Sequence, residues 1–197
     1  MAFYHFNLLL VLISALGTDA AVFTLQNKCE ETAWTGCTFD PSGKGKCITG
    51  DYGGGLNCAG AGGAPPVSLA EFTLNSPMDF YDVSLVDGYN LPISVIPSDG
   101  TGDKCRAIMC VSDLNQKCPN ELQQVEKGKV VGCKSACMAF NKPEFCCTDA
   151  FGDPNTCKPT QFSKIFKESC PMAYSYTYDD LTTTFTCNGA NYLISFC

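Results

Sequence analysis

The stretch CITGDYGGGLNC, from Cys47 to Cys58, places four glycines and one aspartate between two cysteines. This composition is compatible with three kinds of site: a phosphate-binding loop, a metal-binding knuckle, or a turn closed by a disulfide. A phosphate-binding loop is excluded, because the glycines are not followed by Gly-Lys-Ser/Thr. The choice between the other two depends on the rest of the cysteines.

The chain has 15 cysteines, an odd number, so at least one thiol has no partner within the chain. In an oxidising compartment, dense cysteine indicates a disulfide framework rather than a zinc site. The zinc alternative rests on Cys133-x-x-x-Cys137 and on the adjacent Cys146 and Cys147. A bond between adjacent cysteines would be strained, so Cys146 and Cys147 are each expected to have a different partner. Spacing alone leaves the connectivity open.

Residues 1–20 predict a secretory signal peptide cleaved after Ala20. An apolar run from Leu8 to Leu16 is followed by the small residues Thr18 and Ala20, and this run is too short to span a bilayer. The alternative is a buried N-terminal helix, because the segment lacks Lys and Arg. Secretion would place the protein in the extracellular space (apoplast), with the vacuole as an alternative. No later run predicts a transmembrane anchor.

The single histidine, His5, would leave with that segment. The remaining chain then has no residue for a Ser/His/Asp or Cys/His mechanism and no imidazole ligand, so we expect no metal and no cofactor. The chain has 13 Lys and Arg against 20 Asp and Glu, for a net charge of −7. Without a basic stripe, such a chain is a poor binder of nucleic acid or anionic membranes.

The elements that must position any site are mostly β-strands. From residue 21 to about 96 the pattern is typical of strands, with Tyr81, Val83 and Leu85 on one face of the run 79–85. Asp-Gly at 87–88 predicts a hairpin to the alternating run 91–95. Residues 112–170 change to cysteine-rich turns and short helices, of which PTQFSKIFKESC, capped by Thr160, is the clearest. The end of the chain is again β-branched and aromatic.

Several long motifs, in the same order along the chain, resemble the thaumatin-like, pathogenesis-related proteins of plants. They are GKGKCITGDYGGGLNC, PPVSLAEFTLN, DFYDVSLVDGYNLP, CPNEL, PEFCCTDAFGDPNTCKPTQFSKIFKESCP, AYSYTYDD and the closing TFTC…NYLISFC. The resemblance covers residues 21–197. It implies a mainly β fold: an antiparallel β-sandwich with a disulfide-rich helical domain and a small disulfide loop domain. The implied divisions are sandwich 21–35, small loop domain 36–66, sandwich 67–111, helical insert 112–170 and sandwich 171–197.

The resemblance also implies which cysteines are joined. The implied pairs are Cys29–Cys197, Cys37–Cys47, Cys105–Cys187, Cys110–Cys170, Cys118–Cys133, Cys137–Cys146 and Cys147–Cys157. In the family, the residue after Thr-Gly-Asp is a cysteine bonded to the next one along the loop. Here that residue is Tyr52, which leaves Cys58 as the expected free thiol. We expect a monomer, with a covalent dimer through Cys58 as an alternative.

A second departure from the family is larger. Family members have a long β-rich segment between the tryptophan of the first strand region and the Thr-Gly-Cys of the small domain. Here Trp34 is followed at once by Thr35, Gly36 and Cys37. Because the segment supplies strands of the sandwich, its loss is expected to leave unpaired strand edges and exposed apolar surface. A real isoform and a faulty gene model are both compatible with this junction.

The resemblance implies an acidic cleft between the sandwich and the helical domain. Carried over position by position, its acids are Glu71, Asp82, Asp87 and Asp179. The family arginine belongs just before Pro-Pro, where this chain has Ala64. Each aspartate alone is equally typical of a surface turn, but the four together favour a cleft. The aromatic neighbours expected at this cleft are Phe80, Tyr81, Tyr89, Tyr174 and Tyr176.

Two classes of function follow from such a cleft. The first is a secreted defence protein that binds β-1,3-glucan or another polysaccharide of fungal cell walls, through hydrogen bonds to carboxylates and stacking on aromatic rings. The second is a weak endo-β-1,3-glucanase, with Glu71 as the acid and Asp82 as its partner. An inert truncated isoform is a third possibility. We rank the binder first, the inert form second and the enzyme third.

Overall fold

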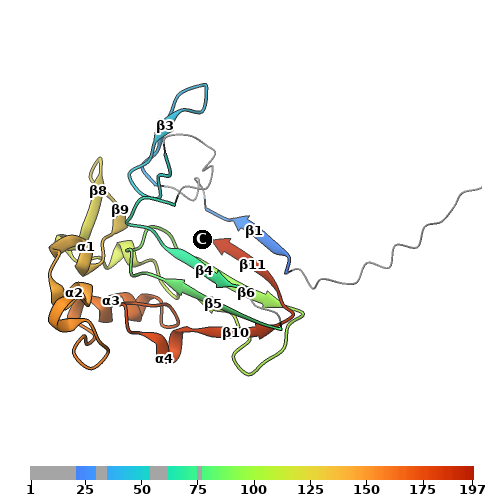
Figure 1. Ribbon diagram of the computed structural model, residues 1–197. Coiled ribbons are helices and arrows are strands. Elements are labelled where there is room, and N and C mark those ends of the chain that lie inside the picture. Colours follow the sequence, from blue (N-terminus) through green and yellow to red (C-terminus); the bar gives the residue numbers. More distant parts are fainter. Residues whose placement is uncertain (1–20, 30–34, 54–61, 75–76) are drawn as a thin grey trace, which may run out of the picture.

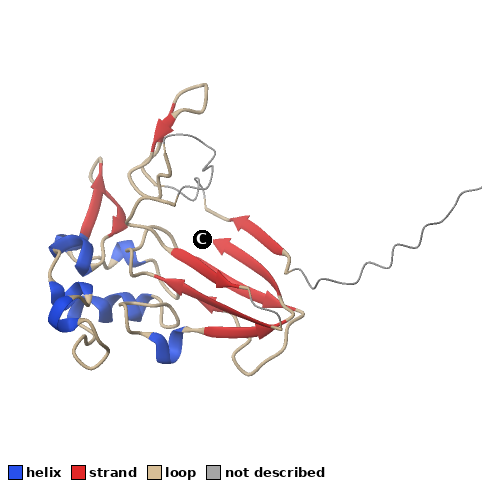
Figure 2. Cartoon of the chain, viewed as in Figure 1, coloured by secondary structure: helices blue, strands red, loops and turns tan. Residues whose placement is uncertain are grey.

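The computed structural model describes residues 21–29, 35–53, 62–74 and 77–197 (Figure 1). The predicted signal peptide, Trp34 and the expected free thiol Cys58 lie outside these ranges. The described chain is mainly β, with its helices gathered at one end of the strands (Figure 2).

Two sheets form the body of the fold. The first has the order β1 (Phe23–Asn27), β11 (Asn191–Phe196), β6 (Ile93–Ser98), β7 (Ile108–Met109), in which β1 runs parallel to β11 and the other neighbours are antiparallel. The second has the antiparallel order β10 (Phe185–Asn188), β5 (Met78–Ser84), β4 (Leu69–Thr73). Two short ladders are separate: β2 (Thr38–Phe39) with β3 (Gly45–Lys46), and β8 (Gln123–Glu126) with β9 (Lys129–Cys133).

The alternation read from residues 79–85 is confirmed, because Tyr81, Val83 and Leu85 are all buried. Tyr81 is central to the core, with its ring centroid 5.3 Å from that of Tyr192 and 5.8 Å from that of Phe185. Its hydroxyl donates to the carbonyl of Arg106 at 2.8 Å, and accepts from the Arg106 backbone N–H at 2.9 Å. The buried hydroxyl is therefore satisfied, as burial requires.

The predicted hairpin across Asp-Gly is wrong. Residues 87–88 do lie in a turn, with Gly88 at φ +89°, but β5 and β6 belong to different sheets. Tyr89, which follows the turn, exchanges backbone hydrogen bonds with Cys133 of β9 at 2.8 and 2.7 Å. The chain after the turn is therefore held by the insert and crosses from one sheet to the other.

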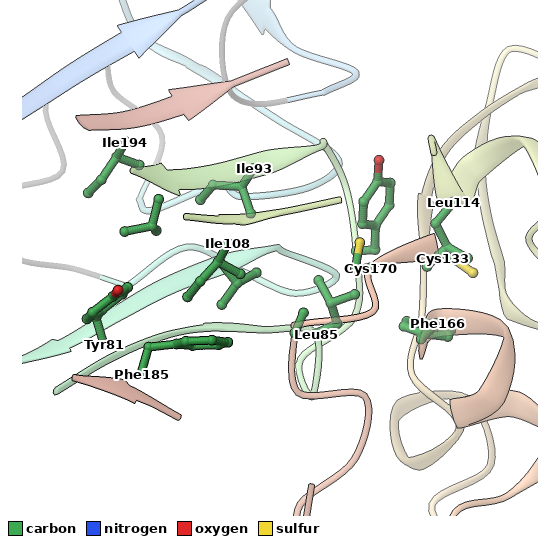
Figure 3. Close-up of a cluster of buried hydrophobic side chains, with 14 of the residues drawn as sticks. Tyr81, Leu85, Ile93, Ile108, Leu114, Cys133, Phe166, Cys170, Phe185 and Ile194 are labelled. Atoms are coloured by element: carbon green, nitrogen blue, oxygen red, sulfur yellow. The ribbon is translucent and has the colours of Figure 1, made fainter. Parts of the chain in front are cut away.

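Helices and short turns occupy the insert. They are η1 (Leu114–Gln116), η2 (Asn120–Leu122), α1 (Ala136–Phe140), α2 (Pro143–Cys146), η3 (Asp149–Phe151) and α3 (Gln161–Ser169); α4 (Asp180–Thr183) follows it. The helix predicted after Pro159 is α3, and Thr160 caps it in a reciprocal capping box with Ser163. Its face bearing Phe162 and Phe166 is buried. Figure 3 shows Phe166 and Leu114 continuing the core that Tyr81 and Ile108 form in the sandwich.

Seven disulfides join the described cysteines, and they are the seven pairs that the family resemblance implies. They are Cys29–Cys197, Cys37–Cys47, Cys105–Cys187, Cys110–Cys170, Cys118–Cys133, Cys137–Cys146 and Cys147–Cys157. Cys110 follows β7 and Cys170 ends α3, so this bond joins the sandwich to the insert. Zinc ligation by the described cysteines is thereby excluded.

The edge strand β1 is poorly covered. All five of its residues are exposed, and Leu25 is 71% exposed. It pairs with β11 on one side, and no described strand pairs with its other edge. Phe23 is its main anchor, with its ring centroid 4.8 Å from that of Phe72. An uncovered apolar edge is what a missing sandwich segment is expected to leave.

Limited proteolysis should distinguish the exposed edge of the sandwich from the disulfide-bonded insert. We expect the first cuts on the sandwich side, in or beside β1, because its backbone and side chains are exposed. The insert should resist, since three disulfides lie wholly within residues 112–170. Mass analysis of the earliest fragments would locate the cuts. First cuts within the insert would contradict this expectation.

Candidate functional site

A pair of carboxyl groups lies on the second sheet. The antiparallel register of β4 and β5 places Glu71 directly opposite Asp82, so their Cβ atoms are neighbours on one face. Asp82 lies on the opposite face of β5 from Tyr81 and Val83, which fill the core. The strand therefore carries Asp82 away from the sandwich interior, beside Glu71.

The pair holds a proton at mildly acidic pH. Burial, followed by the interaction with Glu71 and the charge of Asp180, raises the pKa of Asp82 from 3.8 to about 7. One oxygen of Asp82, Oδ1, is buried without a hydrogen-bond partner among the described residues. Glu71 is exposed. Asp82 is thus the acid of the pair that keeps its proton up to near-neutral pH.

Asp180 is a third acid of this group, and the sequence reading missed it. It is the first residue of α4, and its carboxylate accepts a hydrogen bond from the Tyr174 hydroxyl at 2.8 Å. The backbone of Tyr174 is held against the end of β5, where its N–H donates to the Val83 carbonyl at 2.8 Å. The only sequence signal for this acid was its adjacency to Asp179.

Asp179, another of the expected cleft acids, makes several contacts within the protein. It forms a 3.0 Å ion pair with Lys167 of α3. It also accepts hydrogen bonds from the backbone N–H and the hydroxyl of Ser175, at 3.0 and 2.8 Å. These contacts fasten the segment after α3 onto that helix. All three contacts go to one oxygen, Oδ2, so Asp179 positions the wall of the site.

Asp87 is exposed in the turn that follows β5. It lines a cavity between that turn, the helices of the insert and residues 175–177. Ser175 lines the same cavity and donates a hydrogen bond to Asp179. Asp87 and Asp179 therefore both lie beside the segment that contains Ser175. Within the described residues, no hydrogen bond or ion pair links either of them to Glu71 or Asp82. The structure therefore groups the four acids as a close pair and two flanking positions.

Two of the five expected aromatic neighbours cannot contact a ligand. Tyr81 and Tyr89 are 1% and 0% exposed, and the Tyr89 hydroxyl donates to Asp113 at 3.1 Å. Phe80 is 38% exposed on the face of β5 that carries Asp82, and Tyr174 and Tyr176 are half-buried. These three rings remain available for stacking.

Ala64 occupies the position where the family has an arginine. Its side chain is exposed, and its backbone N–H donates to the Asp51 carbonyl while its own carbonyl accepts from Gly50 at 2.8 Å. Among the described residues, no cluster of three or more His, Cys, Asp or Glu is arranged to hold a metal. No described helix has the length and apolarity needed to cross a membrane.

Several plant proteins are similar to most of the chain. A thaumatin-like pathogenesis-related protein 3.5 from Cryptomeria japonica is 49% identical, covering 96% of this chain and 95% of its own. A thaumatin-like protein from Arabidopsis thaliana is 62% identical over 82% of this chain and 67% of its own. A glucan endo-1,3-beta-glucosidase from Prunus avium is 52% identical over 84% and 69%.

The Cryptomeria alignment spans 229 positions, more than the 197 residues of this chain, so that relative carries residues with no counterpart here. This agrees with a segment missing from the sandwich. The model of the thaumatin family matches residues 18–197. With the fold, the seven disulfides and these relatives, the match shows that the chain belongs to the thaumatin family.

Proposed function

We propose that this protein is a secreted defence protein that binds β-1,3-glucan of fungal cell walls. The observation that carries the proposal is the Glu71–Asp82 pair with Asp180 beside it, on a face that also presents Phe80. Carboxyl groups accept hydrogen bonds from sugar hydroxyls, and a protonated one also donates. Aromatic rings stack on the apolar faces of sugars. The names of the pathogenesis-related and glucosidase relatives support this ligand class.

The pair is better suited to binding than to hydrolysis. Glycosidases separate their two carboxyl groups by about 5–5.5 Å when they retain configuration and by about 6.5–9.5 Å when they invert it. Glu71 and Asp82 lie directly opposite each other on paired strands, with their side chains adjacent on one face of the sheet. They stand side by side on that face rather than on two sides of a bound glycosidic bond.

A weak β-1,3-glucanase remains the second candidate, because a relative with 52% identity bears that activity in its name. In that case Asp82, whose pKa is raised to about 7, would be the proton donor in place of Glu71. Asp180, whose charge also raises the pKa of Asp82, would then be the second carboxylate. The extracellular location, monomeric state and free Cys58 expected from the sequence remain part of the proposal.

Retention on washed, insoluble β-1,3-glucan tests the binding function. Wild-type protein should be retained about equally at low and high salt, because the sugar is neutral. Glu71→Gln combined with Asp82→Asn should weaken retention roughly five-fold, about 1 kcal/mol, through lost hydrogen bonds to the sugar.

A matched control replaces two exposed acids elsewhere, Asp103→Asn with Glu121→Gln, and should bind as wild type. Reducing-sugar release is measured in the same samples. Unchanged retention in the Glu71/Asp82 variant would rule out the pair as the site. Sugar release that Asp82→Asn abolishes would put the enzyme first.

A further inference from the structure

The cavity beside Asp87 has a chemistry different from that of the carboxyl pair. It has a volume of about 110 Å³ and lies between the turn after β5, helices α1, α2 and α3, and residues 175–177. Its floor is apolar, with Phe162 and Phe166 buried and Phe145 and Met138 beside them. For comparison, an apolar cavity of about 150 Å³ is known to hold benzene. The space here is smaller, so it takes at most one six-membered ring, and any substituent of that ring must lie at the rim.

Disulfides hold the shape of this cavity without a ligand. Cys137–Cys146 joins α1 to α2, and Cys147–Cys157 joins the end of α2 to the loop that precedes α3. The start of α3 is fixed by the Thr160 capping box. A cavity built this way is preformed, so a ligand does not have to order its walls.

Four hydroxyl groups of the wall already make hydrogen bonds within the protein. Ser135 accepts a hydrogen bond from the Met138 N–H, and Ser163 accepts from the Thr160 N–H. Thr160 in turn accepts from the Ser163 N–H, and Ser175 donates to Asp179. A sugar ring, with a hydroxyl on most of its carbons, would lose hydrogen bonds to water on entering here. The floor favours an apolar or aromatic ring.

The rim supplies negative charge. Asp87 is exposed and Glu144 is half-buried, and among the described residues neither carboxylate receives a hydrogen bond or an ion pair. Lys158 also lies at the rim, but its ammonium donates to the Pro154 carbonyl at 3.0 Å, within its own loop. Two carboxylates against one ammonium leave the rim with net negative charge, which favours a cationic group and disfavours an anionic one.

We propose that this cavity is a second binding site, which takes a single aromatic ring carrying a cationic arm, that is, a small arylalkylamine. The ring extends an existing aromatic cluster, in which the Phe145 and Phe162 centroids lie 5.7 Å apart in an edge-to-face arrangement. The ammonium pairs with Glu144 and Asp87. We place glucan binding on Glu71 and Asp82, neither of which lines this cavity, although Tyr176 borders it.

Calorimetry with three probes of equal ring size tests the proposal. Tyramine carries a cationic arm, p-cresol has no charge, and 4-hydroxyphenylacetate carries an anionic arm. We expect tyramine to bind roughly ten-fold more tightly than p-cresol, and the anion to bind most weakly. Glu144→Gln should reduce tyramine affinity roughly five-fold and leave p-cresol affinity unchanged. An anion that binds as tightly as tyramine would overturn the proposal.

A steric variant tests the location. Met138→Trp should fill the cavity and abolish binding of both tyramine and p-cresol, with glucan retention unchanged. Met109→Trp, at a methionine of β7 that is 43% exposed and outside the cavity, should bind both probes as wild type does. Near-ultraviolet circular dichroism checks that both variants are folded. Unaltered tyramine binding in Met138→Trp, or displacement of tyramine by glucose, would overturn the assignment.

Discussion

Replacing Asp82 with asparagine is expected to raise the free energy of unfolding at pH 8 by about 2 kcal/mol, and to leave it almost unchanged at pH 4. Burial, with the charges of Glu71 and Asp180, raises the pKa of Asp82 from 3.8 to about 7 in the folded protein. A shift of that size corresponds to about 4 kcal/mol. We halve this because Asp82 is only partly buried, so that water screens its interactions.

The sign of the effect follows from proton binding. Between pH 3.8 and about 7, folded Asp82 holds a proton that the unfolded chain has released. Its contribution to stability therefore falls as the pH rises through this window. Urea unfolding at several pH values should give a flatter pH dependence for Asp82→Asn, with Asp103→Asn behaving as wild type. Parallel curves for wild type and Asp82→Asn would show that the carboxyl is not buried as described.

Removing the disulfide between Cys110 and Cys170, by replacing both with alanine, should cost about 4 kcal/mol and lower Tm by roughly 10 °C. The bond spans 60 residues, and its loss frees a long loop in the unfolded chain. Cys170 is 1% exposed within the core that joins the sandwich to α3. The replacement also removes packing there, so the insert should become mobile relative to the sheets.

The matched control is the bond between Cys37 and Cys47, which spans 10 residues beside the β2–β3 ladder. Its removal should cost at most about 3 kcal/mol, because the loop it closes is short. Thermal unfolding and hydrogen exchange of the α3 amides would compare the variant that lacks Cys110–Cys170 with the variant that lacks Cys37–Cys47. Equal losses of stability, with α3 protected in both, would indicate that the core alone holds the insert.

Patterns set by neighbouring residues were predictable from the sequence. The alternation of Tyr81, Val83 and Leu85 and the Thr160 cap each depend on a few adjacent side chains, and both are confirmed. The failed hairpin shows the limit of such patterns. Asp-Gly at 87–88 fixes a turn, but which strand pairs next is decided by Cys133, 45 positions later, through its hydrogen bonds to Tyr89. The disulfide pairs came from the family resemblance, since spacing left them open.

The candidate site was also predictable only in part, because the resemblance supplies positions but not the packing around them. Family positions gave Glu71 and Asp82, which the β4–β5 register does bring together. They could not show that Lys167 forms an ion pair with Asp179. Nor could they show that the charge of Asp180 helps to raise the pKa of Asp82. One residue along the chain separates those two roles. The difference depends on where α3 and α4 lie, and no local pattern encodes that placement.

The most direct test of the glucan site is to follow side-chain carboxyl carbons by NMR while a soluble β-1,3-glucan oligosaccharide is added at pH 6. We expect the signals of Glu71, Asp82 and Asp180 to shift in a saturable way. The apparent pKa of Asp82 should also change, because the sugar replaces the water near its buried carboxyl. The signals of the exposed residues Asp103 and Glu121 should stay in place. Saturable shifts confined to acids outside this group, or none at saturating sugar, would contradict the account.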